Sequence, residues 1–163
     1  MIIREGMTGD LEQLLEIYNY EVRTGVATFD LHEKTLEEWR GWFYAHNTDN
    51  HPLIVADIGG RVAGYATLSA YRDKEAYTST VELSIYVSPD FRRMGVATEL
   101  MAEILRMARE DGRTHNVVSV ITSGNEASVK LHGKFGFTFC GTIPEVGVKF
   151  GRRLGIDNFS LIV

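Results

Sequence analysis

The sequence predicts an α/β fold, of the α+β kind, built around one mixed and mostly antiparallel sheet. Strand patterns rich in β-branched and aromatic residues come first, at residues 2–4, 52–58, 61–71 and 79–87. From residue 79 onward, strand and helix patterns follow each other in a β-α-β-α-β order. Antiparallel strands followed by a β-α-β-α-β segment indicate a mixed central sheet with helices on both faces.

Two helices are expected among the N-terminal strands. Thr8 or Asp10 can cap the first, whose apolar positions 11, 14, 15 and 18 lie on one face. A polar stretch without a clear period follows at residues 22–34. Thr35 and Glu38 then form a capping box ahead of the apolar positions 36, 39, 42 and 43. Both helices are therefore amphipathic and are expected to pack on the sheet.

Glycines and short apolar runs mark the remaining elements. Gly59-Gly60 makes a hairpin of the second and third strands, because glycine supplies the positive φ values of a two-residue turn. The strand at residues 82–87 stops at Ser88-Pro89-Asp90, and an amphipathic helix runs from Val96 to a stop at Gly112. A strand at 116–122, a short helix after residue 125 and a strand opening at 135–137 complete the chain.

Composition predicts one compact domain over residues 1–163. The chain has 163 residues, of which 44% are hydrophobic and 24% are charged. No apolar run approaches the ~20 residues of a membrane span, and the N-terminal residues are too few and too charged for a signal peptide. The single cysteine, Cys140, excludes an intrachain disulfide framework and fits a reducing compartment. We therefore expect a cytoplasmic protein without a membrane partner.

Several function classes are disfavoured by what the sequence contains. A formal net charge of −5 argues against a nucleic-acid partner, which normally requires clustered basic charge. Histidines 32, 46, 51 and 115 show no metal-ligand spacing, and one cysteine cannot build a sulfur site, so no metal is expected. The motifs Gly-x-Ser-x-Gly and Gly-x-x-x-x-Gly-Lys do not occur, which disfavours a serine hydrolase and a P-loop NTPase.

The turn between the strand at 82–87 and the next helix has the properties of a phosphate cradle. Gly95 lets the backbone approach a ligand closely, and the first amides of the helix lack intrahelical partners. Arg92 and Arg93 add positive charge beside them. An ordinary tight turn is the alternative interpretation of this glycine.

The motif Arg92-Arg93-Met94-Gly95-Val96-Ala97 resembles the acyl-CoA pyrophosphate loop of the GNAT N-acetyltransferases, Gln/Arg-x-x-Gly-x-Gly/Ala. The order of strand, Asn125, short helix and Phe135-Gly136-Phe137 is similar to the second cofactor-binding half of that family. Residues 76–89, 128–132 and 147–152 resemble its phosphinothricin and methionine sulfoximine acetyltransferase branch. The resemblance covers nearly the whole chain. It implies about seven strands and four helices, acetyl-CoA as co-substrate and a homodimer.

Glu82 is the expected catalytic base. A carboxylate in an otherwise apolar strand is desolvated, which raises its pKa toward the range of a base that works at neutral pH. An ammonium acceptor must lose a proton before its nitrogen attacks a thioester, and the family resemblance assigns the base to this same position. The alternative is a Glu82 side chain that faces solvent or pairs with an arginine.

The resemblance also implies the residues that contact acetyl-CoA. The backbone of Ile85, Tyr86 and Val87 would pair with the pantetheine amides. His132 would protonate the departing thiolate, although a packed or hydrogen-bonded histidine is equally open. Asn125 would bind the pantetheine arm or the acetyl carbonyl, with helix capping as its structural alternative. The full cofactor set is Ile85, Tyr86, Val87, Arg92, Arg93, Met94, Gly95, Val96, Ala97, Thr98, Asn125 and Ser128.

Acceptor selection is expected in the loops before the catalytic strand. Arg72, Lys74 and Tyr77 lie just upstream of Glu82 and could hold a carboxylate or a phosphinate-like anion. The resemblance adds Thr28-Phe29 and Lys149-Phe150 to the rim of the pocket. For a surface arginine or lysine, simple solvation is the alternative.

The sequence departs from the branch near the acceptor end. The loop Ser123-Gly124 is short, Gly133 replaces an acidic residue, and residues 153–157 differ from the expected aromatic residue followed by Leu-Asp. The hypothesis is direct acetyl transfer, in a ternary complex, to a small amino-acid-like amine of the phosphinothricin, methionine sulfoximine or methionine sulfone type. Alternatives are a protein N-terminus, a polyamine or an aminoglycoside as acceptor, and a non-catalytic acyl-CoA-binding sensor.

Overall fold

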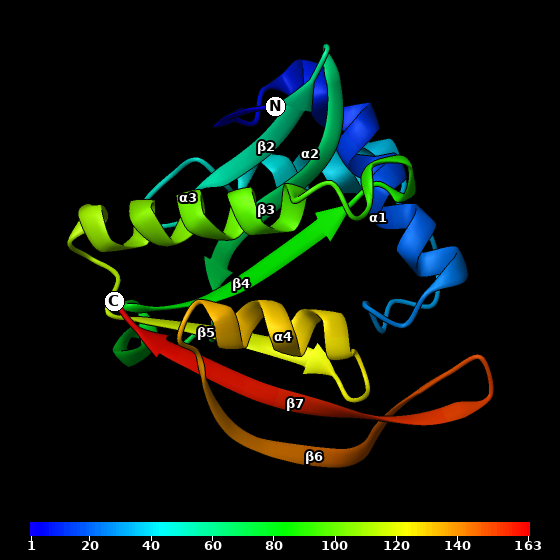
Figure 1. The fold of residues 1–163 in the computed structure, drawn as a ribbon, viewed down its shortest axis with the longest axis vertical. Helices are drawn as coiled ribbons and strands as arrows, with labels where there is room; N and C mark the ends of the chain where they lie inside the picture. The colour runs from blue at the N-terminus through cyan, green and yellow to red at the C-terminus, as the bar shows by residue number, and fades with distance from the viewer.

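A computed structural model describes residues 1–163, and it contains one seven-stranded mixed sheet with helices on both faces (Figure 1). The predicted fold class is confirmed. The elements are β1 (Ile2–Glu5), α1 (Leu11–Thr24), α2 (Leu36–Tyr44), β2 (Leu53–Ile58), β3 (Arg61–Ala70), β4 (Thr80–Val87), α3 (Val96–Asp111), β5 (Asn116–Thr122), α4 (Glu126–Lys134), β6 (Thr138–Lys149) and β7 (Arg152–Ile162). Short 3₁₀ turns occur at Thr8–Asp10, Glu75–Tyr77 and Pro89–Phe91.

The sheet consists of two parts that meet at a short parallel junction. The strand order is β1-β2-β3-β4-β5-β7-β6, and β4 with β5 is its parallel pair. These two strands are paired only from Thr80 with Asn116 to Glu82 with Val118. Beyond that point the arrows of β4 and β5 diverge (Figure 1), whereas β3 stays paired to β4 and β7 to β5. The sheet is therefore open between β4 and β5.

Two hydrophobic clusters hold the helices on opposite faces of the sheet. The larger cluster lies under α3 and also includes Phe137 and Phe159, with side chains of α4 packed against it. The smaller one joins α1 and α2 to β2 and β3 through residues such as Leu14, Trp39 and Tyr65. None of the helices is both long and apolar enough to cross a lipid bilayer.

The predicted helix cap, hairpin turn and helix end are confirmed by hydrogen bonds and backbone angles. The Thr35 backbone NH donates to the Glu38 carboxylate at 2.7 Å, and the Glu38 NH donates to the Thr35 hydroxyl at 3.2 Å, which is the predicted capping box. Gly59 and Gly60 have φ values of 61° and 82°, as a two-residue hairpin turn requires. Gly112 ends α3 with a φ of 74°.

Two expectations for α1 are wrong in detail. Asp10 stands before the helix, but its carboxylate makes no cap hydrogen bond; it accepts instead from Arg4 at 2.8 Å and from the Met7 backbone NH at 2.8 Å. A guanidinium forms a stronger, charge-assisted bond than a helix amide does, which explains this choice. The helix also extends to Thr24, into the stretch without a clear period, because Val22 is buried.

Candidate active site

The opening between β4 and β5 leaves one edge of β4 without a strand partner. Ile85, Tyr86 and Val87 pair with β3 on one side, and no strand lies against their other side. Backbone groups on such an edge can pair with an extended ligand that carries amides. The opening has room for an extended pantetheine arm along β4, and that contact stays a prediction.

The turn before α3 is open in front of its backbone amides. Arg93 and Gly95 both adopt left-handed conformations, with φ values of 63° and 80°, and no side chain caps the helix. A side-chain carbon added at Gly95 would meet nothing within 4 Å. The amides in the first turn of α3, at residues 96–98, therefore face free space with the helix dipole behind them. This geometry suits a diphosphate.

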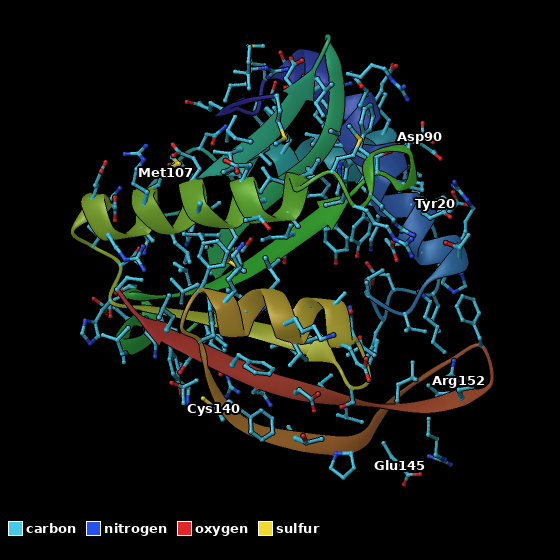
Figure 2. The ribbon with its side chains drawn as sticks, in the orientation of Figure 1. Tyr20, Asp90, Met107, Cys140, Glu145 and Arg152 are labelled. Atoms are coloured by element: carbon cyan, nitrogen blue, oxygen red, sulfur yellow. The ribbon has the colours of Figure 1, made fainter.

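The two arginines of this turn have different surroundings. The Arg92 guanidinium donates to the Glu21 carboxylate at 2.6 Å and lies 5.6 Å from the centre of the Tyr20 ring. Figure 2 shows Tyr20 on α1, on the same side of the molecule as Asp90 and this turn. Arg92 thus ties the turn to α1, and the Glu21 carboxylate offsets the positive charge that Arg92 brings to the turn. Arg93 forms no ion pair and is exposed, as is the neighbouring Met94.

Glu82 is the last residue of β4 that pairs with β5, so it stands where the sheet opens. Its side chain is half-buried, and its carboxylate has neither a hydrogen-bond donor nor a cation beside it in the structure. Burial raises the pKa of the Glu82 carboxyl. The alternative in which Glu82 pairs with an arginine is wrong.

A cavity of about 520 Å³ lies on the α1 and α2 face of the sheet. Glu82 is not one of its lining residues, but the register of β3 and β4 places Glu82 on the same face, beside two of them. Ser69, which is directly opposite Glu82, and Ser84, two residues further along β4, both line it. The complete lining is Tyr18, Asp30, Lys34, Glu38, Trp39, Trp42, Tyr65, Thr67, Ser69, Ser84 and Tyr86. The cavity and the opening in the sheet therefore meet at Glu82.

His132 is buried in the core between α4 and β5. Its Nδ1 lies 2.7 Å from the Ser128 carbonyl oxygen, to which it donates, and its Nε2 lies 2.7 Å from the Ser119 hydroxyl. The ring packs against Phe137, with 4.8 Å between ring centres. Burial lowers the pKa of His132. Both ring nitrogens are engaged inside the protein, which favours the structural alternative over the predicted acid.

Asn125 and Ser128 form the N-terminal cap of α4. The Asn125 side-chain oxygen accepts from the Ser128 backbone NH at 3.2 Å, so the capping alternative is present. The amide NH₂ of Asn125 makes no hydrogen bond within the protein. It follows β5 after a two-residue turn and so lies at the carboxyl end of that strand, where the sheet is open. A cofactor contact from this NH₂ stays a prediction.

The predicted acceptor residues fall into two groups. In the first, the buried Lys149 ammonium donates to the Thr28 carbonyl at 2.8 Å, and Phe29 packs on Gly147. The Lys149 ammonium therefore holds the 22–34 segment to the hairpin of β6 and β7. Burial lowers the pKa of Lys149. Phe150 is exposed with a φ of 53°.

The second group surrounds the β3 to β4 connection. The Arg72 guanidinium lies 5.0 Å from the Tyr71 ring centre and 5.9 Å from that of Tyr77, and Lys74 is exposed nearby in sequence. No hydrogen bond or ion pair joins this group to Lys149 or Thr28. Their joint role at an acceptor stays a prediction.

Sequence reasoning missed the aromatic wall of the cavity. Tyr18, Trp39 and Trp42 were predicted as apolar helix positions, but their rings stack on one another with centres 4.5 and 4.1 Å apart and face the cavity. The signal that could have found the cavity is the alternation of Tyr65, Thr67 and Ser69 on β3. Polar side chains that alternate on the face covered by two helices imply an incompletely filled interface.

Comparison with known proteins agrees with this geometry. Residues 12–137 match the model of the acetyltransferase (GNAT) family. A Pseudomonas paraeruginosa L-methionine sulfoximine/L-methionine sulfone acetyltransferase is 38% identical over 98% of this chain and 92% of that protein. A Streptomyces coelicolor phosphinothricin N-acetyltransferase is 41% identical over 92% of this chain and 89% of that protein.

Solved structures agree as well. A Brucella melitensis ribosomal-protein-alanine N-acetyltransferase superimposes with a TM-score of 0.96 at 37% identity, over 100% of both chains. A Sinorhizobium meliloti phosphinothricin acetyltransferase in complex with acetyl-CoA superimposes with a TM-score of 0.95 at 32% identity, over 99% of this chain and 88% of the other.

The burial of His132 makes stability depend on pH. Unfolded His132 takes up a proton near pH 6.5, but the folded protein resists it, so the unfolded state binds more protons and the free energy of unfolding falls as pH decreases below about 6.5. We expect His132→Gln to reduce this decrease in the free energy of unfolding, by at most about 1.4 kcal/mol per pH unit. Urea unfolding at pH 7.5, 6.5 and 5.5 measures the effect. His32→Gln, at an exposed histidine, is the control, and an unchanged slope in His132→Gln contradicts the prediction.

Proposed function

Because the chain belongs to the GNAT acetyltransferase family and transfers an acetyl group from acetyl-CoA to an amine, we propose that its acceptor is a small amino-acid-like molecule. The proposed class includes phosphinothricin, methionine sulfoximine and methionine sulfone. These are the acceptors in the names of relatives that this chain matches over most of their length. The observation that carries the proposal is Glu82, a half-buried carboxylate at the point where the opened sheet and the cavity meet.

We propose that the residues around the opening bind acetyl-CoA, which supplies the acetyl thioester. The backbone of Ile85, Tyr86 and Val87 would align the pantetheine arm, and the amides of residues 94–98 would bind the diphosphate. Arg93 is the free cation of that turn, whereas Arg92 orders it through Glu21. The side-chain NH₂ of Asn125 would contact the cofactor from the cap of α4. The Ser128 backbone NH orients this side chain by donating to its oxygen.

In the proposed reaction Glu82 acts as the general base, directly or through a water molecule. Its carboxylate takes a proton from the acceptor's ammonium group, and the freed nitrogen lone pair can then attack the thioester carbon. The C–S bond of the thioester then breaks, and the second proton that the attacking nitrogen loses passes to the departing thiolate. The products are the N-acetyl amine and the free thiol of CoA, with the first proton left on Glu82. We assign His132 to holding α4 on β5, because its two nitrogens are already bonded to Ser128 and Ser119.

A thiol-release assay with acetyl-CoA and a panel of amines tests the acceptor class. We expect kcat/KM at least roughly tenfold higher for methionine sulfone, methionine sulfoximine or phosphinothricin than for spermidine or an aminoglycoside, a difference of about 1.4 kcal/mol. A peptide with an N-terminal alanine belongs in the panel, because a structural neighbour at 37% identity carries a ribosomal-protein-alanine name. Preference for that peptide or for polyamines refutes the amino-acid class, and acetyl-CoA binding without any thiol release supports the sensor alternative.

Glu82→Gln tests the base. The amide has the same shape but cannot accept the proton, so we expect kcat to fall by roughly 10²- to 10⁴-fold. The dissociation constant for acetyl-CoA, measured by calorimetry, should stay within about twofold of wild type, because the proposed diphosphate site is a different part of the fold. Glu110→Gln, at the exposed end of α3, is the matched control and should retain kcat. Equal losses of turnover and acetyl-CoA affinity refute the assignment.

We also propose that the protein forms a homodimer through the outer face of β6. This edge strand is exposed along most of its length and carries half-exposed apolar side chains, and Figure 2 shows Cys140, Glu145 and Arg152 along its hairpin with β7. The apolar residues are Phe139, Ile143, Val146 and Val148, followed by Phe150 in the hairpin turn. An unpaired edge with such side chains is a natural surface for a second copy.

Val148→Asp is expected to convert the dimer to a monomer, because the contact would bury the new charge, and Arg153, opposite it on β7, offsets only part of the desolvation cost. Analytical ultracentrifugation measures the mass. Ile2→Asp places the same charge at another exposed apolar residue, on the opposite edge of the sheet, and this variant should remain dimeric. A monomeric wild type, or a Val148→Asp protein of unchanged mass, contradicts the proposal.

The remaining proposals concern the surroundings of the protein. We infer a cytoplasmic location, which the single free cysteine supports, since an exposed thiol suits a reducing compartment. We infer no nucleic-acid or membrane partner, and the net charge of −5 supports this.

A further inference from the structure

A second buried histidine, His46, is held just after the end of α2. Its Nδ1 lies 2.7 Å from the Trp42 carbonyl oxygen. A carbonyl only accepts, so Nδ1 carries the proton. The Nε2 lone pair then accepts from the Ser69 hydroxyl, whose oxygen is 2.8 Å away. Neutral His46 therefore fixes the direction of the Ser69 proton.

Ser69 stands directly opposite Glu82 in the register of β3 and β4. Cross-strand partners point to the same face, with Cβ atoms about 4.5 to 5.5 Å apart. Ser69 lines the cavity, and so does the Trp42 ring. Because its proton is donated to His46, the Ser69 oxygen presents only lone pairs to the cavity. Two acceptor groups, a hydroxyl oxygen and a carboxylate, thus lie side by side at this end.

We propose that the Ser69 oxygen and the Glu82 carboxylate form the subsite that binds the ammonium group of the acceptor, with His46 as a positioning residue. An ammonium group has three N–H donors and no acceptor, so it matches two neighbouring acceptors. The Trp42 ring at the same cavity adds an aromatic face, which attracts a cation. The inference rests on the proposed function and specifies how the amine end of the acceptor is held.

The subsite works only while His46 is neutral. A proton on Nε2 would be donated to the Ser69 oxygen, and the Ser69 proton would then turn toward the cavity and oppose the ammonium donors. The ionisable groups around this pair include His51, which precedes β2, and Glu82, across from Ser69 on β4. Asp30, Lys34 and Glu38 line the same cavity as Ser69. Burial, and the positive charge that His51 can carry, lower the pKa of His46. His46 therefore stays neutral at pH 7, and the switch operates below pH 6.5.

Binding measured without turnover tests the subsite. The probes are L-methionine sulfone and the same molecule without its amino group, titrated while the tryptophan fluorescence is followed, since Trp39 and Trp42 line the cavity. We expect Ser69→Ala to weaken the amine roughly tenfold and to leave the deaminated molecule and acetyl-CoA within about twofold. Ser69→Thr keeps the hydroxyl and should restore most of the affinity. Equal weakening of both molecules, or no weakening of the amine, overturns the proposal.

The pH dependence separates this role from a merely structural histidine. Wild-type affinity for the amine should decrease more steeply below pH 6.5 than that of His46→Gln, which keeps a hydrogen-bonding side chain but cannot titrate. Protonation of Glu82, whose pKa burial raises, weakens binding in both proteins alike. The same decrease in both proteins overturns the role of His46. If thiol release identifies another amine as the acceptor, the comparison is made with that amine and its deaminated form. A wrong acceptor class then refutes the proposed function alone, while Ser69→Ala still decides the subsite.

Discussion

The early end of pairing between β4 and β5 is the constraint on which the site depends. Each strand has a full-length partner on its other side, β3 for β4 and β7 for β5, so the opening costs only the few hydrogen bonds between the two strands themselves. The helices follow the same division, because α3 packs on β2, β3 and β4 while α4 packs beside β5. Strand twist then carries the two parts away from each other. A ligand with amides can occupy the resulting edge without any part of the core being rebuilt.

The C-terminal part of α1 connects the two ends of this site. The Glu21 carboxylate binds Arg92 of the turn before α3, and the Glu21 carbonyl accepts from Lys149 of β6 at 3.4 Å. Lys149 also bonds to Thr28, which in turn contacts the Tyr18 hydroxyl at 2.9 Å. The diphosphate turn, the cavity wall and the β6 to β7 hairpin are therefore fixed to one helix. With the Lys149 ammonium buried, these carbonyl contacts offset its loss of hydration, and breaking them would leave an unpaired charge inside the protein.

The features that the sequence predicts well are those that depend on neighbouring residues. The capping box of Thr35 and Glu38 and the Gly59-Gly60 turn need only a few residues, and the structure contains both. Glu82 could be found because an ionisable residue in an apolar strand is unusual wherever the strand lies. Contacts between distant segments were not accessible: Arg92 meets Glu21 across 71 positions, and His132 meets Ser119 of another element. A motif predicts that a cation or a histidine is present, but not which neighbour engages it first.

His46 and His132 make the same hydrogen-bond pattern, but the serine that each one orients lies in a different environment. Each ring donates from Nδ1 to the carbonyl four residues earlier and uses Nε2 to hold a serine on a strand, Ser69 for His46 and Ser119 for His132. Burial keeps both rings neutral by lowering their pKa values. Ser119 is sealed in the core, so that pair can only join a helix to the sheet. Ser69 lines a cavity beside an unpaired carboxylate, so the same orientation of a hydroxyl proton there determines which groups of a ligand the site accepts. The two histidines have the same geometry, so the surroundings of the serine decide whether the pair only supports the fold or also contacts a ligand.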